Sequence, residues 1–251
     1  MLEVFRLGAS GRTPAEIAAR TGVSRSQVQS WLRLGEAAVL GPPRDSRRPC
    51  LNASDCSLAH LMPRPEYAYL LGQYLGDGHI STMRNGVHRL RITTCNDYPN
   101  IQAECRRAVE IVMPGRRVGL VPRQGCTDVS CYSRHWTCVF PQHGPGSKHE
   151  RPIVLEPWQA VIAIFEQPER FLRGLIHSDG WRGTNRVRGA NGSAYAYPRY
   201  QFSNRSDDIR ELFSLACDRL GVEWRRMNQW NVAVSKRHSV AMLDEFIGPK
   251  N

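Results

Sequence analysis

The sequence has no long apolar run, no C-x-x-C pair and very little lysine. Its longest apolar stretch, near Trp158 to Phe165, is too short to cross a bilayer, so no membrane association is expected. The N-terminal residues MLEVFRLGASGRT lack the apolar segment of a secretory signal. We therefore expect a cytoplasmic protein with reduced cysteines.

The eight cysteines do not follow a standard metal-binding pattern. Cys126, Cys131, His135 and Cys138 are close enough in sequence to suggest zinc, which takes sulfur and nitrogen ligands. Buried free thiols are the more common use of cysteine, and both interpretations stay open.

The composition favours a folded, basic protein. The 251 residues are 41% hydrophobic, enough for one large domain or two smaller ones. The chain carries 34 basic and 23 acidic residues, and its formal charge of +11 suggests a polyanionic partner, a merely basic surface being the alternative. Only three basic residues are lysine, and the other 31 (34 − 3) are arginine, whose planar side chain pairs with phosphates and guanine edges. The lysines are Lys148, Lys236 and Lys250.

Residues 13–34 predict two short helices joined by a turn. Thr13 and Glu16 have the spacing of a helix-capping box, Gly22 allows the turn, and Ser24 caps the second helix. The pattern matches a helix-turn-helix, whose second helix enters the major groove of DNA. Its exposed candidates for contacting bases or phosphates are Arg25, Ser26, Gln29 and Ser30. A helical hairpin used only for packing is the alternative.

The rest of the chain contains an internal repeat. Residues 69–78 (YLLGQYLGDG) and 171–180 (FLRGLIHSDG) are both apolar helices with a central glycine and a terminal Asp-Gly. Their aspartates, Asp77 and Asp179, are 102 positions apart (179 − 77). A second matched pair, Arg134 and Lys236, has the same offset (236 − 134), which indicates duplication.

Small residues recur four positions apart in each motif: Gly72 and Gly76 in the first, Gly174 and Ser178 in the second. Such a strip lets two helix backbones approach closely, and Asp77 and Asp179 would then meet at the helix C-termini. Two carboxylates there repel each other unless a cation lies between them, and Mg²⁺ takes oxygen ligands of this kind. The alternative is that each Asp-Gly merely ends its helix in a turn.

The two motifs resemble the signature helices of single-chain LAGLIDADG homing endonucleases, over about residues 64–249. The resemblance implies an α/β (α+β) fold of two αββαββα units with pseudo-two-fold symmetry, preceded by a small all-α helix-turn-helix domain. The expected division is residues 1–40 for that domain, 41–63 for a linker rich in proline and arginine, 64–150 for the first repeat with its connection, and 151–251 for the second repeat.

The resemblance also implies a monomer that binds double-stranded DNA and cuts both strands with Mg²⁺ or another divalent cation. Bound to DNA, it would be associated with the nucleoid. The metal ligands implied are Asp77, Asp179, Gly76 and Ser178. Family members often place a basic residue beside the metals, a position that Arg134 and Lys236 resemble; a role as phosphate contacts or plain surface residues is the alternative.

In the family, strands form a saddle that enters the major groove. The sequence predicts strands near residues 89–94, 117–122, 127–132, 182–188, 195–203, 223–227 and 231–234, with helices over 98–112, 206–220 and up to 247. The implied DNA contacts are Arg84, Arg89, Arg91, Arg123, Arg182, Arg186, Arg188, Arg199, Arg225 and Gln229. Each is as readily a solvated surface charge.

Two other functions stay open, because LAGLIDADG cores also occur in non-cleaving transcriptional regulators and in RNA-splicing maturases. Recruited regulators commonly lose the acidic pair, whereas this chain keeps Asp77 and Asp179. Against cleavage stand His177 at the motif's first acidic position and the departure of residues 73–76 from the consensus.

Overall fold

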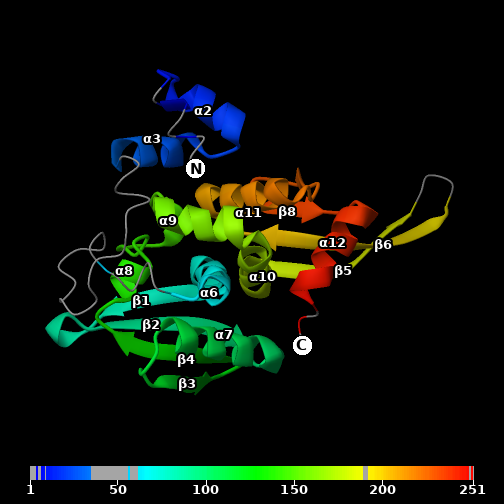
Figure 1. The fold of residues 1–251 in the computed structure, drawn as a ribbon. Coiled ribbons are helices and arrows are strands. Elements are labelled where there is room, and N and C mark those ends of the chain that lie inside the picture. The colour runs from blue at the N-terminus through cyan, green and yellow to red at the C-terminus, as the bar shows by residue number, and fades with distance from the viewer. Residues whose placement is uncertain are drawn as a thin grey trace.

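The computed structural model of the chain describes residues 4, 7–8, 10–34, 56, 62–188, 192–248 and 250. Two helices, α2 (Pro14–Thr21) and α3 (Arg25–Leu34), form a small unit at one end of the molecule, beside a larger α/β body (Figure 1). Most of the expected linker lies outside the described residues. None of the helices in the described ranges is long and apolar enough to traverse a bilayer.

The local chemistry of the small unit agrees with the predicted helix-turn-helix. The Thr13 hydroxyl accepts a hydrogen bond from the Glu16 N–H (3.4 Å), and the Glu16 carboxylate accepts one from the Thr13 N–H (2.8 Å). Gly22 ends α2 with φ = 69°, a left-handed conformation that glycine adopts at little cost. Ile17 and Trp31 are fully buried, so the two helices share a core.

The larger body consists of two units with the same succession of elements. The first comprises α6 (Arg64–Asp77), β1 (Gly78–Thr82), the 3-10 turn η2 (Arg84–Gly86), β2 (His88–Cys95), α7 (Pro99–Val112), β3 (Val118–Arg123), β4 (Cys126–Ser133) and α8 (Trp136–Val139). The second comprises α10 (Pro168–Asp179), β5 (Gly180–Arg188), β6 (Ala194–Ser203), α11 (Asp207–Leu220), β7 (Arg225–Arg226), β8 (Asn231–Val234) and α12 (Arg237–Ile247). Between them lie η3 (Lys148–Glu150), α9 (Pro157–Ala160) and the π-helix η4 (Val161–Glu166).

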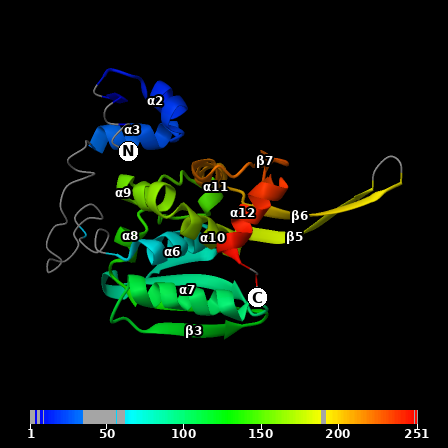
Figure 2. The ribbon, with the colours of Figure 1, turned by 45° about the vertical axis from the view of Figure 1, so that its right-hand side comes forward.

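The two antiparallel sheets have equivalent strand orders, β1-β2-β4-β3 and β5-β6-β8-β7. This equivalence confirms the duplication, and the predicted strands and helices are all present. The sequence does not predict β1, which begins directly after Asp77, nor the short helices α8 and α9. The hairpin of β5 and β6 extends away from the body (Figure 2).

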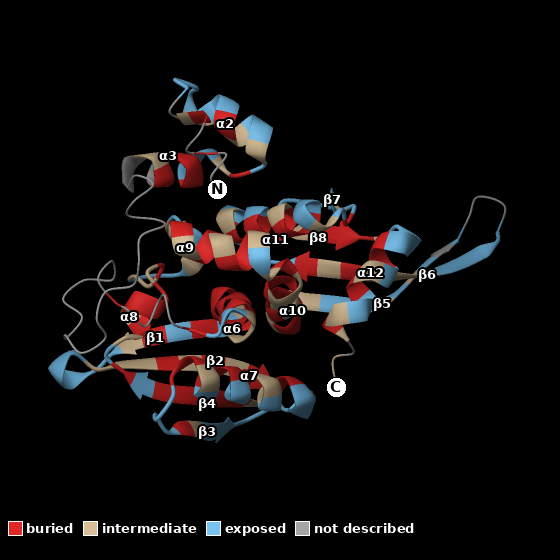
Figure 3. Cartoon of the chain, viewed as in Figure 1, coloured by how far each residue is buried: buried red, intermediate tan, exposed pale blue. Residues whose placement is uncertain are grey.

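Helices α6 and α10, one from each unit, pack against each other at the centre of the body (Figures 1 and 2). Every residue of α6 from 67 to 75 is buried, because α10, α7 and β2 all pack on it; the red segments at the centre of Figure 3 are these two helices. A helix that is covered all round in this way belongs to the interior of the protein.

The contact between α6 and α10 depends on glycine. A Cβ atom on Gly174 would lie 2.2 Å from the carbonyl oxygen of Tyr69, and one on Gly72 would lie 2.6 Å from that of Phe171. Both distances are far below van der Waals contact with backbone atoms, so only glycine fits at either position. The close approach expected from the small residues is therefore present.

Candidate active site

The two motif aspartates come together at the C-terminal ends of the central helices. Asp77 ends α6, Asp179 ends α10, and each helix continues directly into the first strand of its sheet. A Cβ on Gly76, the residue before Asp77, would lie 3.0 Å from Oδ2 of Asp179, so α6 ends against the second carboxylate. We refer to Asp77 and Asp179 as the carboxylate pair.

The environment of the carboxylate pair disfavours two negative charges. Displacement of water by the surrounding protein raises the pKa of Asp77 to about 6, and the charge of Asp179 is the second cause. Asp77 is exposed, so this displacement comes from a concave surface and not from a sealed core. Burial also raises the pKa of Asp179, although a hydrogen bond from Nδ2 of Asn204 to its Oδ2 (2.6 Å) opposes that shift.

Two lysines lie beside the carboxylate pair. Nζ of Lys148 donates to the carbonyl oxygen of Gly76 (2.7 Å), and Nζ of Lys250 donates to that of Gly180. Each ammonium group therefore sits at the C-terminus of one central helix, where the backbone carries partial negative charge. The charges of both lysines lower the pKa of both aspartates.

Burial lowers the pKa of Lys148 to about 8 and also lowers that of Lys250, while the two aspartates oppose both shifts. The lysines are 102 positions apart (250 − 148), the offset that also separates the aspartates. Four charged groups, two from each repeat, therefore meet at one place. Sequence reasoning missed Lys148 and Lys250, although the shared offset and the scarcity of lysine were available signals.

The structure places Arg134 and Lys236, the basic residues expected beside the metals, in other surroundings. Lys236 forms an ion pair with Glu223, and Arg134 is exposed just after β4. The carbonyl oxygens of Gly76 and Ser178, two of the expected metal ligands, face the lysines: the first accepts from Lys148, and the second lies 3.5 Å from Nζ of Lys250.

A cavity of about 410 Å³ opens beside the carboxylate pair. Asp179, Lys148 and Asn204 line it, together with much of the segment that joins the two repeats, residues 143–149. Within that segment, the Ser147 N–H donates to the Glu150 carboxylate (3.1 Å), which orders the turn that carries Lys148. The connection between the two repeats is therefore part of the site.

The first sheet presents a basic open face. Leu90 and Ile92 of β2 are buried, so Arg89 and Arg91 between them point to the opposite face, and register places Arg123 of β3 on that same face. Asp128 of β4 lies among these arginines with its side chain 1% exposed.

Asp128 fixes the orientation of its neighbours on that face. Nε of Arg123 donates to Oδ2 of Asp128 (2.7 Å), Nε of Arg91 lies 3.9 Å from the same atom, and the Thr93 hydroxyl donates to Oδ1 (2.8 Å). Nε of Arg89 donates to the Ser130 hydroxyl (2.8 Å). One buried carboxylate therefore pairs with two arginines, and the face keeps a net positive charge.

The second sheet distributes its arginines differently. Arg182, Arg186 and Arg188 share one face of β5, and Arg182 forms an ion pair with Asp244 of α12 (2.8 Å). Arg182 therefore pairs with a helix of its own unit, and its side chain stays 40% exposed. Arg199 of β6 lies on the opposite face.

Aromatic side chains occupy that opposite face of the second sheet. Trp181 lies on this face near the start of β5 and is 49% exposed. Tyr195, on the extended hairpin, is 53% exposed. The contacts that the sequence predicts on the sheets are arginines and one glutamine, and do not include these rings.

The remaining expected contacts are exposed at the edges of the sheets or on α3. Arg84 lies in η2, Arg225 in β7 and Gln229 in the turn that follows β7. Arg25, Ser26 and Gln29 are exposed on α3, and the side chain of Ser30 lies outside the described part.

Comparison with known proteins gives matches to both parts of the molecule. A sequence profile described as a homeodomain-like domain matches residues 2–36. A comparison with curated proteins finds no match.

Among solved structures, mesophilic variants of I-DmoI are 14% identical, with 73% of this chain and 96% of that chain covered and a TM-score of 0.47. I-DmoI in complex with DNA and Mn gives 14% identity, 74% and 98% coverage and a TM-score of 0.47. I-SmaMI bound to cleaved DNA gives 10% identity, 73% and 83% coverage and a TM-score of 0.49. These neighbours are LAGLIDADG homing endonucleases.

Proposed function

We propose that this protein is a site-specific endonuclease that hydrolyses both strands of duplex DNA with a divalent cation. One observation carries the proposal: two aspartates and two lysines, one of each from each repeat, converge at the ends of the packed helices α6 and α10. A metal-dependent double-strand cut requires two sets of charged groups near one centre, and the duplication supplies them.

The donor set of the carboxylate pair suits Mg²⁺. Asp77 and Asp179 offer hard oxygen ligands, their pKa values are raised, and Asp77 is open to solvent. These two residues would hold the cation, which lowers the cost of keeping both ionised. A bound divalent cation would supply an activated water and stabilise the leaving oxygen of the phosphodiester.

The lysines would balance charge for the incoming phosphate. Lys148 and Lys250 bring two positive charges beside two negative ones, so a phosphate group approaches a nearly neutral site. With a pKa of about 8, Lys148 is still cationic at pH 7, yet it exchanges a proton more readily than an ordinary lysine. Asn204, which donates to Asp179, would hold that carboxylate in place.

The open faces of the sheets would bind the duplex. Arg89, Arg91 and Arg123 give the first sheet a positive face of fixed orientation, and Arg199 and Trp181 lie on the open face of the second sheet. Arginines of this kind contact phosphates or guanine edges. The exposed positions of α3 would add a second, separate contact to DNA.

The test begins with selection of bound fragments from a genomic library, because the target sequence has to be found first. Purified full-length protein is then incubated with the selected duplex and Mg²⁺, and each strand is labelled separately. Wild-type protein is expected to cut both strands. Asp77→Asn and Asp179→Asn are each expected to abolish cutting of at least one strand while binding stays within a few-fold of wild type.

Glu110→Gln serves as a control, since Glu110 is an exposed residue of α7 that pairs with Arg106. It should cut and bind as wild type does. Sequence-specific binding with no cutting under Mg²⁺ or Mn²⁺ would contradict the proposal and favour the non-cleaving regulator.

A further inference from the structure

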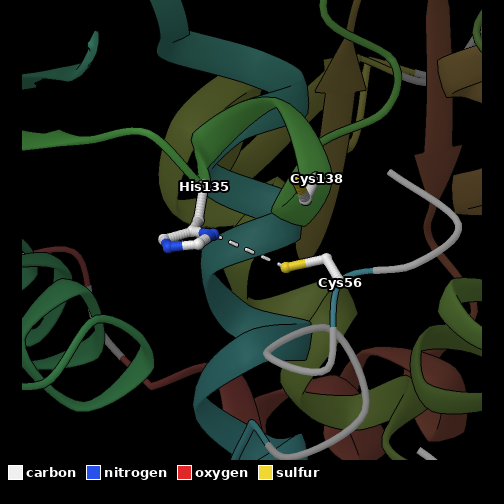
Figure 4. Close-up of side chains that lie close together, drawn as sticks. All are labelled: Cys56, His135 and Cys138. Atoms are coloured by element: carbon white, nitrogen blue, oxygen red, sulfur yellow. Dashed lines mark hydrogen bonds between the residues drawn. The ribbon is translucent and has the colours of Figure 1, made fainter. Parts of the chain in front are cut away.

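Three side chains that do not belong to the carboxylate pair form a compact cluster. Cys56, His135 and Cys138 place one sulfur or nitrogen atom each within 4.8 Å of the others (Figure 4). Cys56 and Cys138 are 1% and 4% exposed, and His135 is half-buried. Cys56 precedes the first repeat, whereas the other two follow β4, so the cluster joins segments that are 79 positions apart (135 − 56).

The separation of Cys56 and His135 matches that of two ligands around zinc. Sγ of Cys56 lies 3.7 Å from Nδ1 of His135. With Zn–S of about 2.3 Å, Zn–N of about 2.05 Å and a tetrahedral angle, the ligand sulfur and nitrogen are expected about 3.6 Å apart. Thiolates and imidazole are soft to intermediate donors that favour zinc over Mg²⁺.

Local hydrogen bonds hold the two residues that follow β4, His135 and Cys138. His135 immediately precedes α8. The Cys138 N–H donates to the carbonyl oxygen of His135 (2.9 Å), so both side chains project from one helical turn. The buried Trp136 anchors this turn through a hydrogen bond from Nε1 to the Cys131 carbonyl (2.9 Å). The Ser133 hydroxyl accepts the N–H of His135 (3.1 Å).

We infer that Cys56, His135 and Cys138 bind a structural zinc ion that fastens the chain before α6 to the end of the first sheet. The two cysteines bind as thiolates and release two protons to solvent, while His135 binds as neutral imidazole. The three side chains supply three of the four ligands of a tetrahedral ion, and the fourth position takes a further donor. Cys126 and Cys131, which the sequence grouped with His135 and Cys138, are not members of the cluster.

Metal content of the full-length protein tests the inference directly. Protein purified without chelator is expected to carry about one zinc per chain, measured by inductively coupled plasma mass spectrometry. Replacement by Co²⁺ should give the visible absorption bands of a tetrahedral site with thiolate ligands. Cys56→Ser and His135→Gln should each weaken zinc binding by more than the roughly 10–100-fold that loss of an outer partner of a metal ligand costs.

Cys126→Ser is the matched control, because this half-buried cysteine lies on β4 in the same unit yet outside the cluster. It should keep one zinc per chain. Circular dichroism of each variant checks that the fold is retained. Three outcomes would overturn the inference. The wild-type protein could contain no zinc and take up no Co²⁺, Cys56 and Cys138 could form a disulfide, or the wild type and Cys56→Ser could bind zinc with equal affinity. None of these measurements depends on DNA cleavage.

Discussion

A methyl group added at Gly174 would enter space that the backbone of α6 already fills. The new Cβ would lie 2.2 Å from the carbonyl oxygen of Tyr69, whereas ordinary contact begins at 3.4 Å, so the helices must part by about 1.2 Å (3.4 − 2.2). Overpacking of this kind costs about 3 kcal/mol at the upper end of its usual range. Alanine recovers about 1 kcal/mol through its higher helix propensity.

The net loss for Gly174→Ala is therefore about 2 kcal/mol. For a chain of this size, that corresponds to a fall in Tm of about 4–8 °C, measured by calorimetry. Under the proposed function, the effect on cleavage should be larger. Displacing Asp179 from Asp77 by about 1 Å is expected to lower the cleavage rate about 10²-fold, because reacting groups tolerate little misplacement.

Two comparisons separate this explanation from a general loss of stability. Gly76→Ala also collides, with its Cβ 2.2 Å from Oγ and 2.5 Å from Cβ of Ser178, so Ser178→Gly should largely relieve it. No such side-chain change relieves Gly174→Ala, because its collision is with backbone. Gly119→Ala in β3 meets no atom closer than 3.9 Å and should leave Tm unchanged or slightly higher. A Gly174→Ala protein as stable as wild type would refute the reasoning.

Three further outcomes follow from the contacts described. Lys148→Met and Lys250→Met should each lower single-turnover cleavage by about 10²-fold while DNA binding changes little, because a positioned cation is lost from the reaction centre; equal losses of binding and cleavage would count against this role. Burial raises the pKa of Glu104, but hydrogen bonds and charge from Arg173 outweigh it and hold that pKa below its usual 4.5. The carboxylate therefore stabilises the fold above pH 4.5 and loses this effect as the pH falls through its folded pKa, so Tm should decline less steeply below pH 4.5 in Glu104→Gln than in wild type. Thr13→Ala removes the capping hydroxyl of α2 and should destabilise that helix by about 1 kcal/mol, seen as faster amide exchange in α2 with no change in α6.

The sequence was informative wherever a structure depends on local chemistry. The capping box at Thr13 and Glu16 formed as its spacing predicts, because both partners lie within one helical turn. The helix that Ser206 caps ends at Gly221, with φ = 71°, for the same kind of reason. The alternating residues 89–94 predict a strand, and β2 contains them.

Sequence reasoning was less complete where partners come from distant segments. The sequence predicts Arg182 as a DNA contact and gives no sign of its ion pair with Asp244, 62 positions away. The cluster of Cys56, His135 and Cys138 was not anticipated as a set, because nothing local links Cys56 to the end of β4. Such pairings are decided by packing, which a pattern within a short window does not contain.

The duplication, the two central helices and the glycines that let them touch can all be predicted from the sequence, since repeated motifs and the absence of a side chain are properties of the chain alone. The cations beside the aspartates, Lys148 and Lys250, become apparent only in the folded chain, where Lys236 pairs with Glu223. An ammonium group is stabilised, against the cost of its burial, where helix carbonyl oxygens and opposite charges converge. That convergence exists only after segments about 70 residues apart have packed together (148 − 77 = 71 and 250 − 179 = 71).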